Sequence, residues 1–428
     1  MMFTCSPADH RGAGATATGP TATGRAGGAR KRFSVDIHCH VHTPAAEELV
    51  RPHFEPEFEP MIAFSNEATR EVNRKQQETI YGQLTSIEQR LKHMDKAGID
   101  IQAISPSPPQ YYYWAEPELG AEAARLINDN IAGIMQAHPE RIVGIGTVPL
   151  QSPELAVREL ERAVKELGLR GVEINTNVAG AELAEDRFRP FFAKAQELGI
   201  LVFLHPNGFT EGRRLADHYF INVIGNPLDS SVAVHHLIFG GVLDAYPRLK
   251  ICVAHGGGYL PAYSGRIDHA HSARTDCRRC IKRKPTSYLK KLYFDTIVFT
   301  HHQLEYLVEQ YGADHLLLGS DYPYDMAPTN AVNFVESAKL KTVEKAAILG
   351  GNAARLLKVK APAKSAAATK TAAKPAAKKP AKTTGGRAAA ARSGAAKHPA
   401  PKPAPRPAAA KTRSAAKPSS TRGAKGKG

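Results

Sequence analysis

Short apolar runs alternate with amphipathic stretches through most of the chain, and this alternation restricts the fold to one built from β/α units. Each run is rich in Val, Ile or Leu and lacks strict polar alternation, as expected for strands that are covered on both faces. Eight such units within roughly 320 residues predict an α/β fold, a single (β/α)8 TIM barrel, with a doubly wound open sheet as the alternative. The eight runs are FSVDIHCH (33–40), GIDIQAIS (98–105), RIVGIGTVPL (141–150), LRGVEIN (169–175), ILVFLHP (200–206), LKICVAHGGG (249–258), KLYFDTI (291–297) and HLLLGSD (315–321).

The stretch SPELAVRELERAVKELG (152–168) is the clearest helix between these runs. Ser152 can cap its N-terminus, Pro153 stands in the first turn, and Gly168 ends it. PFFAKAQELG and HHQLEYLVEQYG, further along the chain, follow the same pattern. Residues 51–83 are too many for a plain loop after the first strand. We therefore expect an insertion there, over the mouth of the barrel, that can act as a lid.

Positive charge is concentrated at the ends of the chain. Residues 361–428 contain 17 Lys and Arg and no acidic residue, whereas the whole chain carries a formal charge of +16. Ala, Lys and Pro cannot bury enough apolar surface to offset the entropy of ordering. We therefore expect a disordered leader (1–32), the barrel (33–358) and a disordered basic tail (359–428). The tail suits weak, salt-sensitive binding of nucleic acid or another polyanion, or only solubility.

Membrane and secretory signals are missing from the sequence. The N-terminal region lacks the apolar core of a secretory signal, and no later run is long and apolar enough to span a bilayer. Five scattered cysteines do not suggest a disulfide framework. These observations predict a cytoplasmic protein without a membrane partner.

Histidines and one aspartate gather at the predicted strand ends. His38 and His40 stand on the first strand, His205 on the fifth, His255 on the sixth and Asp321 on the eighth. Active sites of such barrels lie at the C-terminal ends of the strands, so these side chains should converge at one mouth. Imidazole and carboxylate together suit one divalent ion, Zn²⁺ first and Mn²⁺ as the alternative. His42 lies one step past the pair, and we expect it to be exposed, with a contact to a metal ligand or to the substrate as the alternative.

Several segments together resemble the amidohydrolase superfamily, in its aminocarboxymuconate-semialdehyde decarboxylase-like branch. They are DIHCH, QYYYWAEPE, LHP, VAHGGGYLPAYSGRIDH and LLLGSDYPYDM, and the resemblance covers roughly residues 34–357. It implies that the metal is held by His38, His40, His205 and Asp321. It also implies that His255 is the catalytic histidine, with Asp321 as a further proton carrier.

The resemblance also bears on the substrate and on assembly. Arg266 matches an arginine that reaches a substrate carboxylate in the neighbouring subunit, which implies a homodimer. Tyr113 and Trp114 belong to an aromatic run that suggests contact with a flat or conjugated substrate, or core packing instead. Tyr81 stands near the place of a second substrate arginine, so an aromatic hydroxy acid is favoured over aminocarboxymuconate semialdehyde itself.

We therefore expect a metal-dependent, non-oxidative decarboxylase, a carbon–carbon lyase, acting on a small anionic aromatic hydroxy acid or muconate-type carboxylate. A hydrolase or hydratase is the alternative, because a metal centre of this kind serves both chemistries. A nucleic-acid-associated protein that acts through its basic tail is the alternative of another class.

Overall fold

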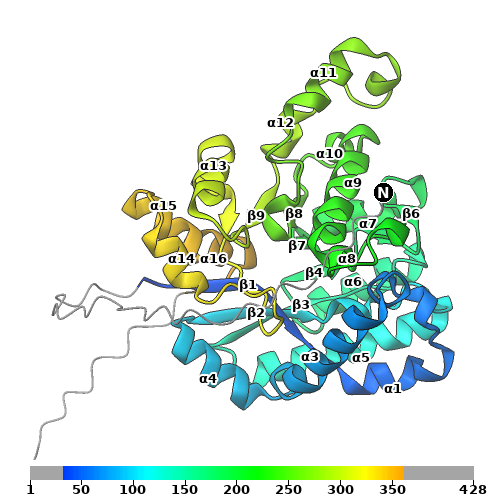
Figure 1. Ribbon diagram of the computed structural model, residues 1–428, viewed down its shortest axis with the longest axis vertical. Coiled ribbons are helices and arrows are strands. Elements are labelled where there is room, and N and C mark those ends of the chain that lie inside the picture. The colour runs from blue at the N-terminus through cyan, green and yellow to red at the C-terminus, as the bar shows by residue number, and fades with distance from the viewer. Residues whose placement is uncertain (1–31, 361–428) are drawn as a thin grey trace, which may run out of the picture. The chain divides into compact units, whose positions relative to one another are not determined.

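Each of the eight apolar runs forms a strand in the computed structural model, which describes residues 32–360 (Figure 1). All neighbouring strands pair in parallel, in the order β1-β2-β3-β4-β7-β8-β9-β10. The ring closes between β10 and β1, where the amide of Ile37 donates to the carbonyl of Leu318 at 2.9 Å. The predicted (β/α)8 barrel is therefore confirmed. The barrel strands are β1 (Val35–Val41), β2 (Ile101–Pro106), β3 (Ile142–Gly146), β4 (Gly171–Ile174), β7 (Leu201–Leu204), β8 (Lys250–Val253), β9 (Tyr293–Asp295) and β10 (Leu316–Leu317).

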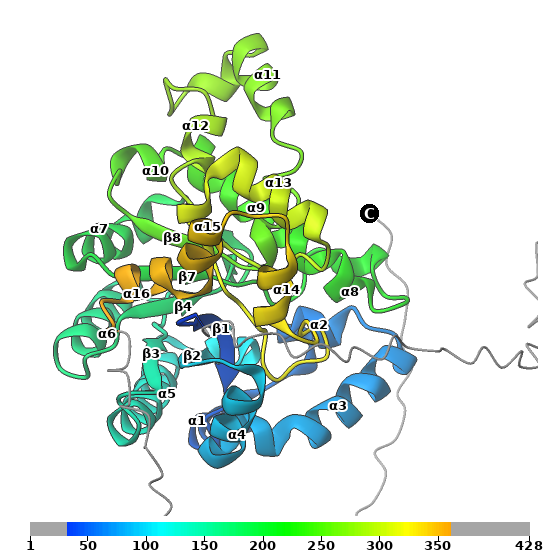
Figure 2. The ribbon, with the colours of Figure 1, turned by 90° about the vertical axis from the view of Figure 1, so that its left-hand side faces the viewer.

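Helices surround the strands, as Figure 2 shows by a view turned by 90°. A short antiparallel hairpin, β5 (Asn177–Val178) with β6 (Ala181–Glu182), follows β4. The helices are α1 (Pro44–Val50), α2 (Pro60–Ala63), α3 (Glu67–Thr85), α4 (Ile87–Ala97), α5 (Pro117–Ala137), α6 (Pro153–Lys165), α7 (Arg189–Leu198), α8 (Phe220–Val223), α9 (Gly225–Phe239), α10 (Val242–Ala245), α11 (Gly265–Ala273), α12 (Thr286–Leu289), α13 (His301–Tyr311), α14 (Ala331–Ser337), α15 (Thr342–Ala346) and α16 (Asn352–Leu357).

Helix α6 occupies the stretch for which the sequence predicts the clearest helix. Pro153 stands in its first turn, and Ser152 occupies the capping position but makes no side-chain capping hydrogen bond. The carbonyl of Ser152 accepts instead from the amide of Ala156 at 2.9 Å. Gly168 lies beyond the last helical residue with φ +76°, a left-handed conformation that glycine adopts readily.

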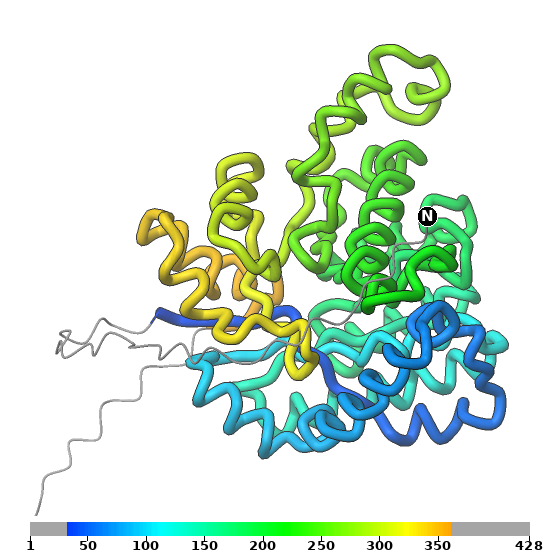
Figure 3. The backbone as a smooth tube through the Cα atoms, viewed as in Figure 1, coloured from blue at the N-terminus to red at the C-terminus, as the bar shows by residue number. Residues whose placement is uncertain are grey.

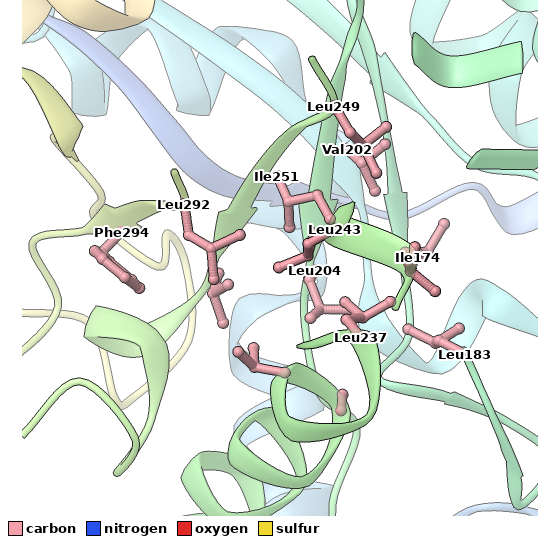
Figure 4. Packing of buried hydrophobic residues seen from close by; sticks show 14 of the residues in the cluster. Ile174, Leu183, Val202, Leu204, Leu237, Leu243, Leu249, Ile251, Leu292 and Phe294 are labelled. Atoms are coloured by element: carbon pink, nitrogen blue, oxygen red, sulfur yellow. The ribbon is translucent and has the colours of Figure 1, made fainter. Parts of the chain in front are cut away.

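The largest apolar cluster lies between the strands β4, β7, β8 and β9 and the helices that cover them (Figure 4). Leu204 of β7 and Leu237 of α9 belong to it with Ile174 of β4, and each is at most 1% exposed. Burial of such side chains contributes about 1.5–3 kcal/mol each. This packing holds β7 and β8, which lead directly to His205 and to the turn that carries His255.

Two segments depart from the simple barrel. The predicted insertion (51–83) follows α1 and contains two short 3₁₀ turns, α2 and most of α3, and α4 then leads into β2. The segment with α11 and α12 projects from the barrel, as the tube in Figure 3 shows. The predicted leader and basic tail lie almost wholly outside the described residues. Within residues 32–360, no helix combines the length and the apolar character needed to cross a membrane.

Candidate metal centre

Four side chains from three strand ends meet at one point of the barrel. One ligand atom from each of His38, His40, His205 and Asp321 lies within 4.8 Å of the other three. The Nε2 atoms of His38 and His40 are each 3.4 Å from the same oxygen, Asp321 Oδ1. All four side chains are buried, with exposures between 0% and 5%. The sequence reasoning named the same four residues.

Backbone pairing sets this arrangement. His38 and His40 are two apart on β1, so their side chains point to one face of the strand. Asp321 follows β10, and its amide donates to the carbonyl of His38 at 2.8 Å. His205 directly follows β7, and its amide donates to the carbonyl of Ile174 at 3.0 Å. The residues that carry the ligands are thus tied to each other or to the neighbouring strand.

The rings of His38 and His40 are oriented through their second nitrogens. Nδ1 of His38 lies 2.6 Å from Asp295 Oδ2, and Nδ1 of His40 lies 3.0 Å from the carbonyl oxygen of Pro106. Each contact directs Nε2 of its ring into the cluster. Metal-binding histidines in proteins are held in this way, which sets the tautomer and the ring orientation.

The inward nitrogens support a metal rather than a closed polar network. Within residues 32–360, Nε2 of His38, Nε2 of His40 and both ring nitrogens of His205 are buried without a hydrogen-bond partner. Buried polar atoms rarely remain unpaired, because each lost hydrogen bond costs about 1–3 kcal/mol. Three imidazole nitrogens and one carboxylate oxygen form a donor set that fits one divalent cation.

The electrostatics of the cluster also favour a bound cation. Burial alone would lower the pKa of His38, but the carboxylates of Asp321 and Asp295 raise it to about 10. Burial would raise the pKa of Asp321, yet His38 and His40 hold it well below its usual range. The two carboxylates therefore stabilise positive charge at His38, and a divalent ion would satisfy the same field.

His255 stands beside the four ligands but outside their cluster. It follows β8 with φ +55°, and its Nε2 is 3.9 Å from Asp321 Oδ2. Burial and the neighbouring His38 lower the pKa of His255 to about 4. Asp321 also has a left-handed backbone, with φ +54°. Non-glycine residues in this conformation are uncommon and cluster at functional sites.

A cavity of about 540 Å³ opens beside the cluster, and His255 and Asp321 line it. The insertion forms much of its wall, since the lining residues include several from α3 and the turns that precede it. His42 also lines it. The expectation that His42 is exposed was wrong: the side chain is 7% exposed and its Nε2 lies 2.8 Å from Glu47 Oε2. The volume suits a small organic ligand.

The remaining predicted site residues lie elsewhere. Arg266 is exposed on α11 and is not among the residues that line the cavity. Tyr113 is buried against Tyr111, with ring centroids 5.8 Å apart. Trp114 stacks on Phe58 of the insertion at 5.0 Å. The neighbouring Tyr112, rather than either predicted aromatic residue, is part of the cavity wall.

Sequence reasoning missed two buried carboxylates near the cluster. Asp295 orients His38, as described, and Glu173 Oε2 lies 3.9 Å from Nδ1 of His40. Both side chains are fully buried, at the ends of β9 and within β4. A lone acidic residue inside an otherwise apolar strand, as in GVEI and YFD, is the signal that could have identified them.

Comparisons with known proteins agree with this geometry. A family model described as Amidohydrolase matches residues 35–359. The chain is 35% identical over 270 residues to a 2-amino-3-carboxymuconate-6-semialdehyde decarboxylase of Dictyostelium discoideum, covering 63% of this chain and 75% of the relative. It is 32% identical over 285 residues to a gamma-resorcylate decarboxylase of a Polaromonas species, covering 64% and 87%.

Two solved structures extend the likeness to the fold. A 5-carboxyvanillate decarboxylase from Sphingomonas paucimobilis superposes with a TM-score of 0.70 at 27% identity, covering 77% of this chain and 99% of the other. A dihydroxybenzoic acid decarboxylase from Polaromonas, with bound manganese and the inhibitor 2-nitroresorcinol, superposes with a TM-score of 0.65 at 27% identity. The coverage there is 76% of this chain and 97% of the other.

Proposed function

The chain belongs to the amidohydrolase family, and we propose that it is a metal-dependent, non-oxidative decarboxylase of an aromatic hydroxy acid or muconate-type carboxylate. One observation carries this proposal. Three histidines and one aspartate form a divalent-metal site beside a cavity, in a chain whose relatives at 35% and 32% identity are decarboxylases.

We propose that His38, His40, His205 and Asp321 hold one divalent ion per chain. Zn²⁺ is our first expectation, and Mn²⁺ is the alternative because a relative of similar fold binds manganese. When bound, such an ion would supply Lewis acidity, which polarises a substrate oxygen next to the departing CO₂. Elemental analysis of protein expressed with both ions in the medium distinguishes the two.

We assign proton handling to His255 and Asp321. In decarboxylation the bond between the substrate carbon and its carboxylate breaks, CO₂ leaves, and the electron pair remains on the carbon. A proton must then reach that carbon. His255 lines the cavity, and its Nε2 is 3.9 Å from Asp321 Oδ2. This placement supports His255 as the donor and Asp321 as the group that exchanges the proton with it.

An aromatic substrate fits the aromatic side chains of the cavity wall, and Arg51, Arg70 and Arg74 in the same wall suit an anionic one of either class. Tyr81, which stands near the place of a second substrate arginine, is not itself a lining residue, but its ring lies 5.9 Å from that of His42, which is one. Tyr112 and Phe54 offer aromatic surface in the wall. The sequence predicts that Tyr113 and Trp114 contact the substrate or pack in the core. We propose that they support this surface from behind, Trp114 through its ring contact with Phe54 at 5.8 Å.

We further propose that the enzyme is a homodimer in which Arg266 binds the substrate carboxylate of the neighbouring subunit. Arg266 is exposed on the projecting helix α11, away from the cavity of its own chain. Tyr263 and Phe299 are large apolar side chains with exposures of 70% and 54%. They line a second cavity, which His255 also borders. A second subunit would cover this apolar surface close to the site.

CO₂ release tests the proposed function. Metal-loaded protein is offered a panel of ortho-hydroxybenzoates and carboxymuconates, with Asp321→Ala as the control. We expect CO₂ from one class of compound and none from the variant. Metal-loaded protein that hydrolyses or hydrates a substrate, yet releases no CO₂ from any of them, would favour the alternative chemistry.

A further inference from the structure

Glu59 is a buried carboxyl group in the cavity wall, and the proposed reaction does not use it. Glu59 is 7% exposed and lines the same cavity as His255 and Asp321. No ion pair to Glu59 exists within residues 32–360, where its polar neighbours are Asn207 and Trp114. A buried carboxyl group without a cation is unusual, since burying charge is costly. It therefore needs an explanation.

Contacts of Glu59 and of the next residue, Pro60, with the loop after β7 fix the position of Glu59. Its Oε2 accepts a hydrogen bond from Nδ2 of Asn207 at 2.5 Å, and Asn207 stands two residues after the metal ligand His205. The amide of the next residue, Gly208, donates to Oδ1 of Asn226 at 2.7 Å. Pro60 packs so closely on Gly208 that a Cβ there would lie 2.9 Å from the Pro60 Cβ. The insertion and the ligand-bearing loop therefore form one rigid piece of wall.

Burial determines which form of the carboxyl group is present. It raises the pKa of Glu59 to about 8, and the hydrogen bond from Asn207 together with the nearby indole of Trp114 opposes this only in part. At neutral pH the group is therefore mostly a neutral acid, which carries one O–H donor. Within residues 32–360, the one hydrogen bond of the Glu59 carboxyl group is accepted from Asn207, so the O–H of the neutral acid has no protein acceptor. An ionised group would instead repel an anionic substrate.

The aromatic side chains next to Glu59 define the shape of such a ligand. Phe58 precedes Glu59 and stacks on Trp114 with an interplanar angle of 18°. Phe54, in the same segment, lines the cavity and contacts Trp114 at 5.8 Å. The donor is therefore set in an aromatic part of the wall, which suits a planar ring that carries a polar substituent.

We propose that Glu59 is a specificity-determining residue that donates a hydrogen bond to an acceptor oxygen of the substrate, separate from the carboxylate that leaves as CO₂. That oxygen belongs to a carbonyl, an alkoxy group or a second carboxyl group. The identity of the ligand as an aromatic acid rests on the proposed function. The hydrogen bond itself does not depend on turnover, so binding of unreactive compounds can test it.

The probes are nitrophenols, which have a planar anionic group but no carboxylate to lose. 2-Nitrophenols with an acetyl group at ring position 4 or 5 are compared with the matching isopropyl compounds, which have a similar shape and no acceptor. Affinities for the metal-loaded, full-length protein are measured by isothermal titration calorimetry. For the wild type we expect one acetyl compound to bind about fivefold or more tightly than its isopropyl partner, as one hydrogen bond allows.

The variants separate the hydrogen bond from packing. Glu59→Gln should keep the preference, because its amide still donates, whereas Glu59→Leu should bind the two compounds equally. Glu59→Met serves if the leucine variant does not fold. Glu57→Gln, an exposed residue in the same segment, is the matched control and should behave as the wild type.

Either of two results would overturn the inference: a wild type without the preference, including one that binds no probe, or a preference that survives in Glu59→Leu or Glu59→Met. If the wild type releases CO₂ but binds the acetyl and isopropyl probes equally, the inference about Glu59 is wrong and the proposed function is unaffected. If the wild type prefers the acetyl probe but releases no CO₂, the inference about Glu59 is supported and the proposed function is contradicted.

Discussion

Single buried carboxylates determine the properties of individual residues around the metal centre. Asp295 is fully buried, and the hydrogen bond from His38 keeps its pKa low although burial would raise it. Its Oδ2 also accepts from the amide of His255 at 2.9 Å. One carboxylate therefore orients a metal ligand and fixes the backbone of the proposed proton donor. Glu59, without a cation, takes the opposite state and remains protonated.

The raised pKa of Glu59 predicts a pH-dependent cost to folding. Its pKa is about 8 in the native protein and near the ordinary value of 4.5 in the unfolded chain. Between these values the native state binds the proton more tightly, so stability falls as pH rises from about 4.5 to about 8. Glu59→Gln removes this loss, which is on the order of 5 kcal/mol above pH 8.

Melting temperatures of both proteins, measured at fixed metal content between pH 5 and pH 9, check this expectation. The melting temperature of the Glu59→Gln protein, relative to that of the wild type, should increase as pH rises. Glu57→Gln is again the control, because that side chain is exposed and should shift nothing. Parallel curves for wild type and Glu59→Gln would contradict the assignment of a protonated Glu59.

At the scale of elements, the alternating apolar runs were sufficient to predict every barrel strand. The predicted helix ends at α7 and α13 hold for local reasons: Gly199 ends α7 with φ +61°, and the side chain of Thr300 accepts from the amide of Gln303 at the start of α13. The insertion shows the limit of such reasoning. Its length predicted an added segment over the mouth, but its contribution of Glu59 to the wall depends on contacts across 148 positions.

The projecting element α11 yields a prediction about assembly. Arg266→Ala and Asp321→Ala should each abolish turnover, because one removes the arginine that the partner needs and the other the metal site. Dimers that contain one subunit of each kind regain one intact site, so they should show about half of the wild-type activity per dimer.

The two variants are co-expressed with different affinity tags. Successive purification on each tag then gives the mixed dimers for this assay. Arg278→Ala, an exposed arginine in the same projecting segment, is the matched control and should remain active alone. Mixed dimers that stay inactive would show that Arg266 does not act across the interface.

At the scale of the whole molecule, a bound metal should stabilise the folded barrel. Its ligands come from β1 and from the residues after β7 and β10, which are far apart in sequence. A ligand that binds only the native state stabilises it, by about 2.7 kcal/mol at 100 times its Kd. Removing the ion by chelation should therefore lower Tm by about 4 °C at that ligand excess, and adding Zn²⁺ or Mn²⁺ back should restore it.

Differential scanning calorimetry of chelated and reloaded protein measures this shift. The Tm difference between reloaded and chelated protein should mostly disappear in His205→Ala. It should remain in His302→Ala, which changes an exposed histidine of α13. Equal Tm values for the chelated and reloaded wild type would argue against a metal held by these four residues.

The basic tail should be separable from the enzyme. The family match ends at residue 359, and every proposed ligand and catalytic residue precedes it. Deleting residues 361–428, which carry 17 basic side chains, should therefore leave kcat/KM unchanged. Retention on immobilised DNA at low salt should fall sharply, since such binding depends on the number of basic contacts. Loss of turnover with fold and metal intact would contradict this separation.

The sequence by itself predicted the barrel and the gathering of histidines and an aspartate at its strand ends, whereas the choice of four ligands and the reaction class came from its resemblance to a known family. Strand periodicity and the chemistry of His and Asp are local properties, so they can be read one segment at a time. Only the tertiary structure decided which polar groups support the site. Asp295, Glu173 and Glu59 acquire their roles from burial and from partners on distant strands, and His42 is buried for the same reason. Desolvation and pairing arise only once the chain has folded, because both depend on which distant residues become neighbours.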